Sequence, residues 1–144
     1  MSLSALDVAE YILQKHGRMS AMKLQKLVYY AQAWSLVWDD VPLFRDEIQA
    51  WKEGPVVRAL WEKHRGQFTV SPGEIKRDPK ALSKVQRETV DSIIKHYGKH
   101  DGLTLSNWTH REDPWNEARK GLSADASSDA EITHASMRDY YGSL

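Results

Sequence analysis

The segment THREDPW, residues 109–115, places a histidine, an arginine and two acids within seven positions. His110, Glu112 and Asp113 could supply groups for acid–base catalysis or ligands for a metal ion. A structural role is also available, since Asp113 is typical of a helix N-cap and Pro114 of the first helical position, with His110 closing the preceding helix. Capping accounts for most of these polar groups, and we therefore favour the structural interpretation. The alternative is a metal-assisted or acid–base hydrolase centred on His110, Glu112 and Asp113.

A second possible metal site is the pair His96 and His100, whose four-residue spacing places two ligands on one face of a helix. Gly98 lies between them at an expected helix end, and no HExxH pattern accompanies them. The chain contains no cysteine, which excludes disulfides, thiolate ligands and a cysteine nucleophile. We expect no metal ion, no cofactor and no catalytic residue.

The composition is that of a soluble globular protein. Of the 144 residues, 41% are hydrophobic and 28% charged, and 20 Lys and Arg balance 20 Asp and Glu. A net charge of zero gives no general attraction to nucleic acid or to an anionic membrane, so we expect neither partner. The first residues lack the basic leader and apolar run of a signal peptide, and no apolar run approaches the ~20 residues of a membrane span. These features predict a cytoplasmic protein.

Helix signals divide the chain into short helical segments around one long helix. Apolar residues at helical spacing, with Ser20 as N-cap, predict this long helix over residues 21–38. Capping boxes that begin at Ser4 and Ser83 predict a helix after each of them. Further helices are expected over 55–65 after Gly54, over 103–110 with Thr104 or Ser106 as cap, over 114–118 after Asp113, and after a capping box that begins at Ser128.

Two segments show a strand pattern. LFRDEIQAW, residues 43–51, predicts a short strand or an extended loop. FTV and EIK, residues 68–70 and 74–76, predict a small two-stranded piece within an exposed loop. The length predicts one domain over residues 1–144. The expected fold is mainly α, a single compact domain of six to seven helices with at most one short β-hairpin.

The first two expected helices, joined by the residues HGRMS, resemble the start of a helix-turn-helix unit. Lys23 and Lys26 could then contact phosphate, which keeps a DNA-binding regulator as a second alternative function. Because the basic cluster is confined to this region of a neutral chain, we favour other functions.

Aromatic residues offer the strongest physical argument for a protein partner. Four of them lie on the long expected helix: Tyr29, Tyr30, Trp34 and Trp38. They span more than one face of that helix, so we expect part of this aromatic surface to be exposed. Interface energy concentrates at aromatic and arginine residues. Burial of all six tryptophans in the core is the alternative.

Four blocks of sequence resemble successive signature blocks of the Panacea domain, the family of phage-associated GepA-like proteins and SocA-type antitoxins. The blocks are KLQKLVYYAQAWSLVW, PLFRDEIQAWKEGPVV, LSNWTHREDPWNEAR and MRDYY, and the resemblance extends over residues 5–141. One departure is Trp108, which stands where the family more often has leucine. The resemblance implies a mostly helical, non-enzymatic domain that neutralises an unrelated toxin by direct binding. At least one relative is an adaptor that delivers its toxin to the protease ClpXP.

On this resemblance we expect an antitoxin, and we expect its partner to be a protein toxin encoded by a neighbouring gene, with ClpXP as a further partner. We expect contact with the partner on the long helix, at the AWKEGP turn and at the THREDPW corner, through Tyr29, Tyr30, Trp34, Trp51, Lys52, Glu53, His110, Arg111 and Glu112. Structural roles are expected for Leu24, Leu27, Gly54, Pro55, Asp113, Pro114 and Trp115.

Overall fold

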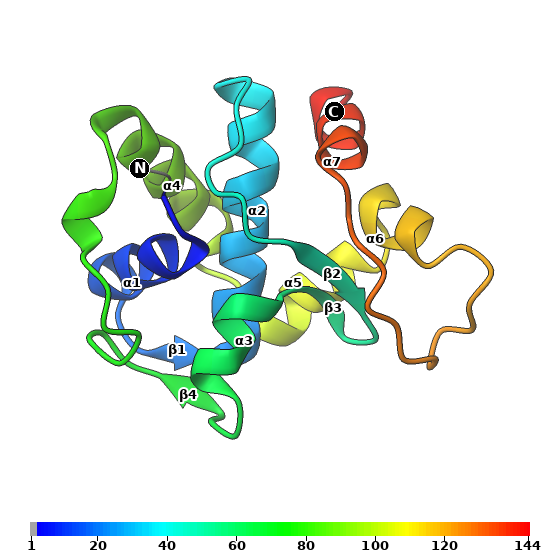
Figure 1. Cartoon of the computed structure of the whole chain (residues 1–144), viewed down its shortest axis with the longest axis horizontal. Coiled ribbons are helices and arrows are strands. Elements are labelled where there is room, and N and C mark those ends of the chain that lie inside the picture. The colour runs from blue at the N-terminus through cyan, green and yellow to red at the C-terminus, as the bar shows by residue number, and fades with distance from the viewer. Residues whose placement is uncertain (1–2) are drawn as a thin grey trace.

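The computed structural model describes residues 3–144, and its centre is the long helix α2 (Ala21–Trp38). Figure 1 shows α2 upright, with the other elements around it. Four helices pack against it, namely α1 (Ala5–His16), α4 (Lys84–Tyr97), α5 (Gly102–Thr109) and α7 (His134–Gly142). The others are α3 (Arg58–His64), α6 (Asp113–Ala118) and the 3-10 helix η1 (Pro79–Ala81). Seven α-helices in the described part of the chain confirm the predicted mainly α domain.

Helix α2 is buried on almost every side because its apolar residues do not form a single stripe. Two glutamines on it are buried as well and bind backbone groups of other segments. Oε1 of Gln25 accepts a hydrogen bond from the N–H of Val57 over 2.8 Å. Oε1 of Gln32 accepts one from the N–H of Leu43 over 2.7 Å. These side chains satisfy backbone donors that no neighbouring strand reaches.

Three helix starts coincide with predicted caps. Ser4 and Ser83 form complete capping boxes at α1 and α4, and the Ser20 hydroxyl accepts from the backbone at the start of α2. The predicted cap of α5 is wrong. Asp101 holds that position and accepts from the N–H of Thr104 over 2.8 Å, because its carboxylate precedes the hydroxyl side chains in the chain and caps equally well.

A β-hairpin stands beside α2. Strand β2 (Ile48–Trp51) pairs antiparallel with β3 (Gly54–Val57), with Trp51 opposite Gly54. This confirms a short strand within residues 43–51 and the presence of a short hairpin in the fold, although its second strand lies where a helix was predicted. Lys52 and Glu53 form the tip of this hairpin. The tip is therefore the exposed end of a rigid element that is buried along most of its length.

The prediction of a helix from Gly54 and Pro55 onward is wrong. Both residues lie in β3, with Pro55 opposite Ala50, and α3 begins only at Arg58. Gly54 has a φ of +119°, which is outside the helical region, so the chain cannot enter a helix there. Pairing with β2 therefore overrides the local signal of proline at a helix start.

A third segment extends the hairpin on its other side. The N–H of Ile132 donates to the carbonyl of Ile48 over 2.8 Å, so residues 130–132 run alongside β2. This pairing holds the segment extended, and α7 begins after the N-cap Thr133. The predicted helix start at Ser128 is therefore wrong.

A second pair of strands joins the loop after α1 to the loop after α3. Strand β1 (Met19–Ser20) pairs antiparallel with β4 (Thr69–Val70). The predicted pairing of residues 68–70 with 74–76 is wrong, since 74–76 forms no strand. Ile75 is buried, and Lys76 beside it has a left-handed φ of 62°, which breaks an extended conformation.

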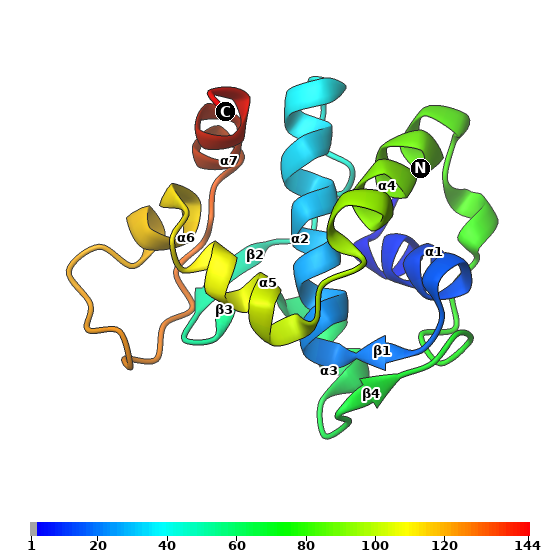
Figure 2. The ribbon, with the colours of Figure 1, turned by 180° about the vertical axis from the view of Figure 1, so that it is seen from behind.

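Seen from behind, α7, α2 and α4 stand next to one another, and α5 runs across below them (Figure 2). Within residues 3–144, every helix is too short or too polar to span a bilayer.

Candidate partner-binding site

At the corner between α5 and α6, the carboxylate of Glu112 is turned toward the core. Oε1 of Glu112 accepts hydrogen bonds from the hydroxyls of Tyr30 and Tyr141, each over 2.8 Å. Burial raises the pKa of the Glu112 carboxyl, and the two hydroxyl donors oppose this shift.

Glu112 also holds the N-cap position of α6, so Asp113 is the first helical residue and the predicted Asp113 cap is wrong by one position. The extended backbone of Glu112 starts the helix one residue earlier than the Asp-Pro signal indicates.

The imidazole of His110 lies against Trp115, with ring centroids 4.2 Å apart. The indole N–H of Trp115 donates to the carbonyl of Trp51 over 2.7 Å, which joins α6 to the hairpin tip. Nε2 of His110 is buried and has no hydrogen-bond partner among the described residues. Burial lowers the pKa of His110, and the charge of Lys26 lowers it further, which favours the neutral imidazole. His110 thus contributes to the packing of this corner.

His110, Glu112 and Asp113 do not converge on a common point. Glu112 is bonded to tyrosines, His110 packs on an indole, and Asp113 is exposed at the start of α6. In the part of the chain that the structure describes, no three His, Asp or Glu side chains are placed to hold a metal ion. The geometry gives Glu112 and His110 structural contacts.

Lys26 is a buried cation at the centre of this region. Lys26 is 2% exposed. It runs beneath Gly54, where an added β-carbon would lie 2.6 Å from Cε of Lys26. Burial lowers the pKa of Lys26 to about 8, although the carboxylate of Glu53 opposes the shift. Sequence reasoning missed this burial because lysine is almost never fully buried.

The two lysines that could have bound DNA lie in different environments, since Lys23 is half-buried and Lys26 is buried. Nζ of Lys23 donates to the carbonyl of Gly98 over 2.5 Å, and Lys26 is buried. The buried Lys26 cannot reach a phosphate in this fold, so the expectation is wrong for Lys26. The reason is that α2 lies at the centre of the domain, whereas a recognition helix must lie on the surface.

Arg119 is a second buried cation that sequence reasoning missed. Its guanidinium donates to the carbonyls of Ala50, Ser123 and Ala126, over 2.9, 3.2 and 2.6 Å. It also stacks on the ring of Trp115, 4.9 Å from the ring centroid. One side chain thereby joins α6, the hairpin and the loop that follows α6. Nothing in the local sequence distinguishes it from a surface arginine at a helix end.

The predicted contact residues fall into three groups. Tyr29 and Tyr30 are 1% and 0% exposed, so the expectation that they form a contact surface is wrong for this conformation, because α4, α5 and α7 cover them. Half-buried positions are held by Trp34, Trp51, His110 and Glu112. Exposed positions are held by Lys52, Glu53 and Arg111. Of the predicted structural residues, Asp113 is exposed, and the buried ones are Leu24, Leu27, Gly54, Pro55, Pro114 and Trp115.

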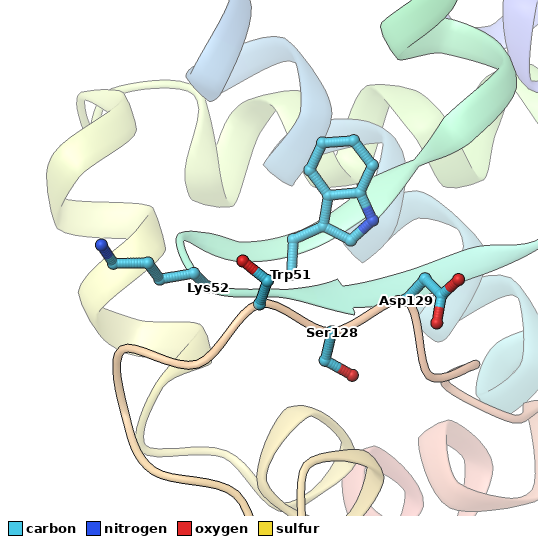
Figure 3. A pocket seen from close by; sticks show the side chains of 5 residues that line it. Trp51, Lys52, Ser128 and Asp129 are labelled. Carbon is cyan, nitrogen blue, oxygen red and sulfur yellow. The ribbon is translucent and has the colours of Figure 1, made fainter.

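A groove of about 470 Å³ lies between the hairpin tip and the loop after α6. Figure 3 shows Trp51 and Lys52 on the hairpin, and Ser128 and Asp129 on the loop that runs beside it. The Trp51 ring points toward α3, where it meets Trp61 at a centroid distance of 5.3 Å. The groove is open to solvent and carries one cation and one anion.

A further group of aromatic residues is carried by α2, α4, α5 and α7 and includes residues that sequence reasoning did not select. We call it the aromatic strip, and its members are Trp34, Trp38, Tyr97, Trp108 and Tyr140. Trp34 and Trp38 stack at 5.0 Å, and the indole N–H of Trp34 donates to the Tyr97 hydroxyl over 3.0 Å. Tyr97 meets Trp108 edge-on at 6.1 Å. Burial raises the pKa of Tyr97, and the nearby Tyr140 adds to the shift. Trp38 is 48% exposed, which confirms that part of the aromatic surface of α2 reaches solvent.

Comparison with known proteins identifies the family. The family model described as "Antitoxin SocA-like, Panacea domain" matches residues 24–116, which run from the first turn of α2 into α6. No protein of curated function and no solved structure shows significant similarity to the chain. Since the match covers well over half of the sequence, the chain belongs to the SocA-like antitoxin family with the Panacea domain.

Proposed function

We propose that this protein is the antitoxin of a toxin–antitoxin pair, and that it acts in the cytoplasm by binding a protein toxin encoded by a neighbouring gene. The observation that carries the proposal is the family match over residues 24–116. That range includes α2, the hairpin, α4, α5 and the start of α6, and therefore most of the domain's core.

Two features of the site support a binding role. The hairpin tip presents Lys52 and Glu53 on a support that the bond from Trp115 to Trp51 holds in place. Lys26 is buried beneath the same tip, and this burial disfavours its charged form and is unfavourable for stability. Structure that reduces stability is common where a protein's surface is shaped for function. We propose contact with the toxin through Trp51, Lys52, Glu53 and Arg111, and through Trp34 on α2.

Co-purification tests the proposal directly. The product of the adjacent gene, produced with an affinity tag and together with this chain, is expected to elute with it as one complex in gel filtration. A double variant at the hairpin tip, Lys52→Ala with Glu53→Ala, is expected to reduce the recovered complex. Phe68→Ala is the matched control, because Phe68 is 84% exposed and lies next to β4, away from the tip. Recovery of the two proteins in separate peaks would refute the proposal.

The proposal includes delivery of the toxin to ClpXP, which rests on the resemblance to an adaptor relative. Delivery and simple masking differ in one measurable respect. In cells without ClpX, delivery predicts that the toxin persists and kills although the antitoxin is present. Survival of such cells would leave direct masking as the mode of action and would exclude delivery.

A further inference from the structure

Charge is distributed unevenly along this neutral chain. From residue 112 to the end there are seven acids against three bases: Glu112, Asp113, Glu117, Asp125, Asp129, Glu131 and Asp139 against Arg119, Lys120 and Arg138. Two of these bases are already engaged. Arg119 binds backbone carbonyls, and Arg138 pairs with Asp40 at 3.3 Å. The end of the molecule built by α6 and α7 is therefore acidic.

The acids concentrate in two adjoining grooves between α6 and α7. One groove, of about 330 Å³, is lined by Asp113, Glu117, Ser136, Asp139 and Tyr140. Its neighbour shares Glu117 and Ser136 and adds Glu131. No lysine or arginine lines either groove, and none of the four carboxylates forms a salt bridge with another residue in the described range 3–144.

The aromatic strip adjoins these grooves. Tyr140 lines the first groove and its ring meets that of Tyr141 at a centroid distance of 4.9 Å, while Trp34 of the strip meets the same Tyr141 ring at 5.5 Å. At the other end of the strip Trp38 is 48% exposed. Figure 2 shows the elements that carry the strip, with α7 and α4 on either side of α2 and α5 below. Half-exposed aromatic rings and unpaired carboxylates thus lie near one another, with the buried Tyr141 ring between Trp34 and Tyr140.

We propose that the aromatic strip and the carboxylate grooves together form the docking surface for a basic segment of the toxin, with its arginine or lysine side chains held between rings and carboxylates. This inference rests on the proposed antitoxin function and names the chemistry of its partner. A guanidinium stacks on the faces of tryptophan and tyrosine and binds carboxylates with two parallel hydrogen bonds. Tryptophan and tyrosine are also the residues at which interface energy concentrates.

The charges decide between a basic segment and other occupants. An uncharged apolar segment could cover the rings, but it would remove water from the four carboxylates without replacing the lost hydrogen bonds, which is costly. A basic segment pairs with them instead. The surplus of negative charge on this face also accelerates association with a positive partner, in a manner that salt weakens.

Calorimetric titration with the purified product of the adjacent gene tests the surface. We expect Trp38→Ala, and separately Glu117→Gln combined with Asp139→Asn, each to raise the Kd about tenfold or more. Matched controls are Phe68→Ala for the ring and Glu88→Gln for the charge, since both residues are exposed and lie elsewhere. Raising the salt concentration is expected to weaken binding of the native chain more than binding of the double variant.

The outcomes separate the two proposals. If the native chain binds and the strip and groove variants bind equally well, the docking surface is wrong and the antitoxin function stands. If the native chain does not bind at all, the proposed function is wrong, and this inference is wrong with it.

A second titration needs no toxin and uses the six tryptophan indole signals in an NMR spectrum. A peptide of alternating arginine and leucine is expected to shift the signals of Trp34 and Trp38, while those of Trp51 and Trp61 stay in place. A peptide with glutamine in place of arginine is expected to shift none of them. An equal response to both peptides would indicate that an apolar segment, and not a basic one, binds this surface. A shift of the Trp34 and Trp38 signals when the protein alone is concentrated would indicate that a second copy of the chain binds this surface. Either result would overturn the proposal.

Discussion

The hydroxyl of Tyr141, in the last helix, donates a hydrogen bond of 2.8 Å to Oε1 of Glu112 at the start of α6. The same oxygen accepts from Tyr30 on the central helix. One carboxylate oxygen therefore ties three helices together. Because Tyr141 lies beyond the range of the family match, this bond also joins α7 to the part of the fold that the family shares.

Loss of that bond is expected to be costly. Tyr141→Phe removes the hydrogen bond to a partly buried carboxylate and the 3.0 Å hydrogen bond that the Tyr141 hydroxyl shares with the Tyr29 hydroxyl, and the bond to the carboxylate alone is worth about 1.5–3 kcal/mol of unfolding free energy. Tyr140→Phe is the control, since the hydroxyl of Tyr140 makes no hydrogen bond within residues 3–144, and its effect is expected to stay within about 0.5 kcal/mol. Urea unfolding followed by tryptophan fluorescence measures both. Equal effects of the two variants would show that the bond contributes nothing.

The buried Lys26 makes the free energy of unfolding depend on pH in the alkaline range. Its pKa is about 8 in the folded protein and 10.5 for an ordinary lysine, so between these values the unfolded chain binds a proton that the folded chain does not. Unfolding free energy therefore rises with pH, by roughly 2–3 kcal/mol between pH 8 and 10. Above pH 10 the buried tyrosines, whose pKa values the fold raises, act in the opposite direction. Lys26→Met is expected to abolish the rise and to stabilise the protein at pH 7. Lys95→Met, at an exposed site on α4, should leave the rise intact.

Gly54 is constrained by its backbone and by its neighbour. Gly54→Ala forces a φ of +119° on an L-residue and places a β-carbon 2.6 Å from Lys26 Cε, so we expect a loss of about 2–4 kcal/mol. Gly66→Ala separates the two effects. Gly66 has a φ of +84° with nothing within 4 Å of an added β-carbon, and its replacement is expected to cost only about 1–2 kcal/mol. Adding Lys26→Ala to Gly54→Ala should recover part of the loss, and strictly additive losses would contradict the close approach.

Arg119 is expected to control the loop between α6 and α7. Arg119→Lys keeps the charge but loses the planar fork that reaches three carbonyls, at a cost of about 2–3 kcal/mol. Hydrogen exchange should then accelerate across residues 120–131, whereas α1 should change only in step with global stability. Arg111→Lys, at an exposed position, is the control. Unchanged exchange in the loop would show that other contacts hold it.

Local signals in the sequence predict the parts of the fold that depend on local chemistry. The caps at Ser4, Ser20 and Ser83 and the extent of α2 are confirmed, because each depends on residues within one or two turns. The helix predicted from Gly54 and Pro55 is wrong because contacts with residues distant in the sequence stabilise the strand there. These contacts are the pairing with β2 and the hydrogen bond from the N–H of Val57 to Gln25. The residues that adjoin Pro55 in the sequence do not reveal these long-range contacts.

Prediction of the candidate site from the sequence is likewise limited by contacts between residues that are distant in the chain. The family resemblance and the exposure of part of the aromatic surface are confirmed by the match and by Trp38. Tyr29 and Tyr30 are nevertheless in the core, because helices from the second half of the chain cover them. The sequence gives no reason to select Tyr97, because it comes next to Trp34 only when α4 packs on α2. Surface composition depends on such packing and not on spacing along one helix.

The central claim is that this chain neutralises a toxic neighbour. The most direct test counts colonies after the adjacent gene is induced alone, with the native chain, and with the hairpin-tip variant Lys52→Ala combined with Glu53→Ala. We expect loss of colonies with the adjacent gene alone, full recovery with the native chain, and reduced recovery with the variant. An adjacent product that is harmless on its own, or one that remains lethal beside the native chain, would contradict the account.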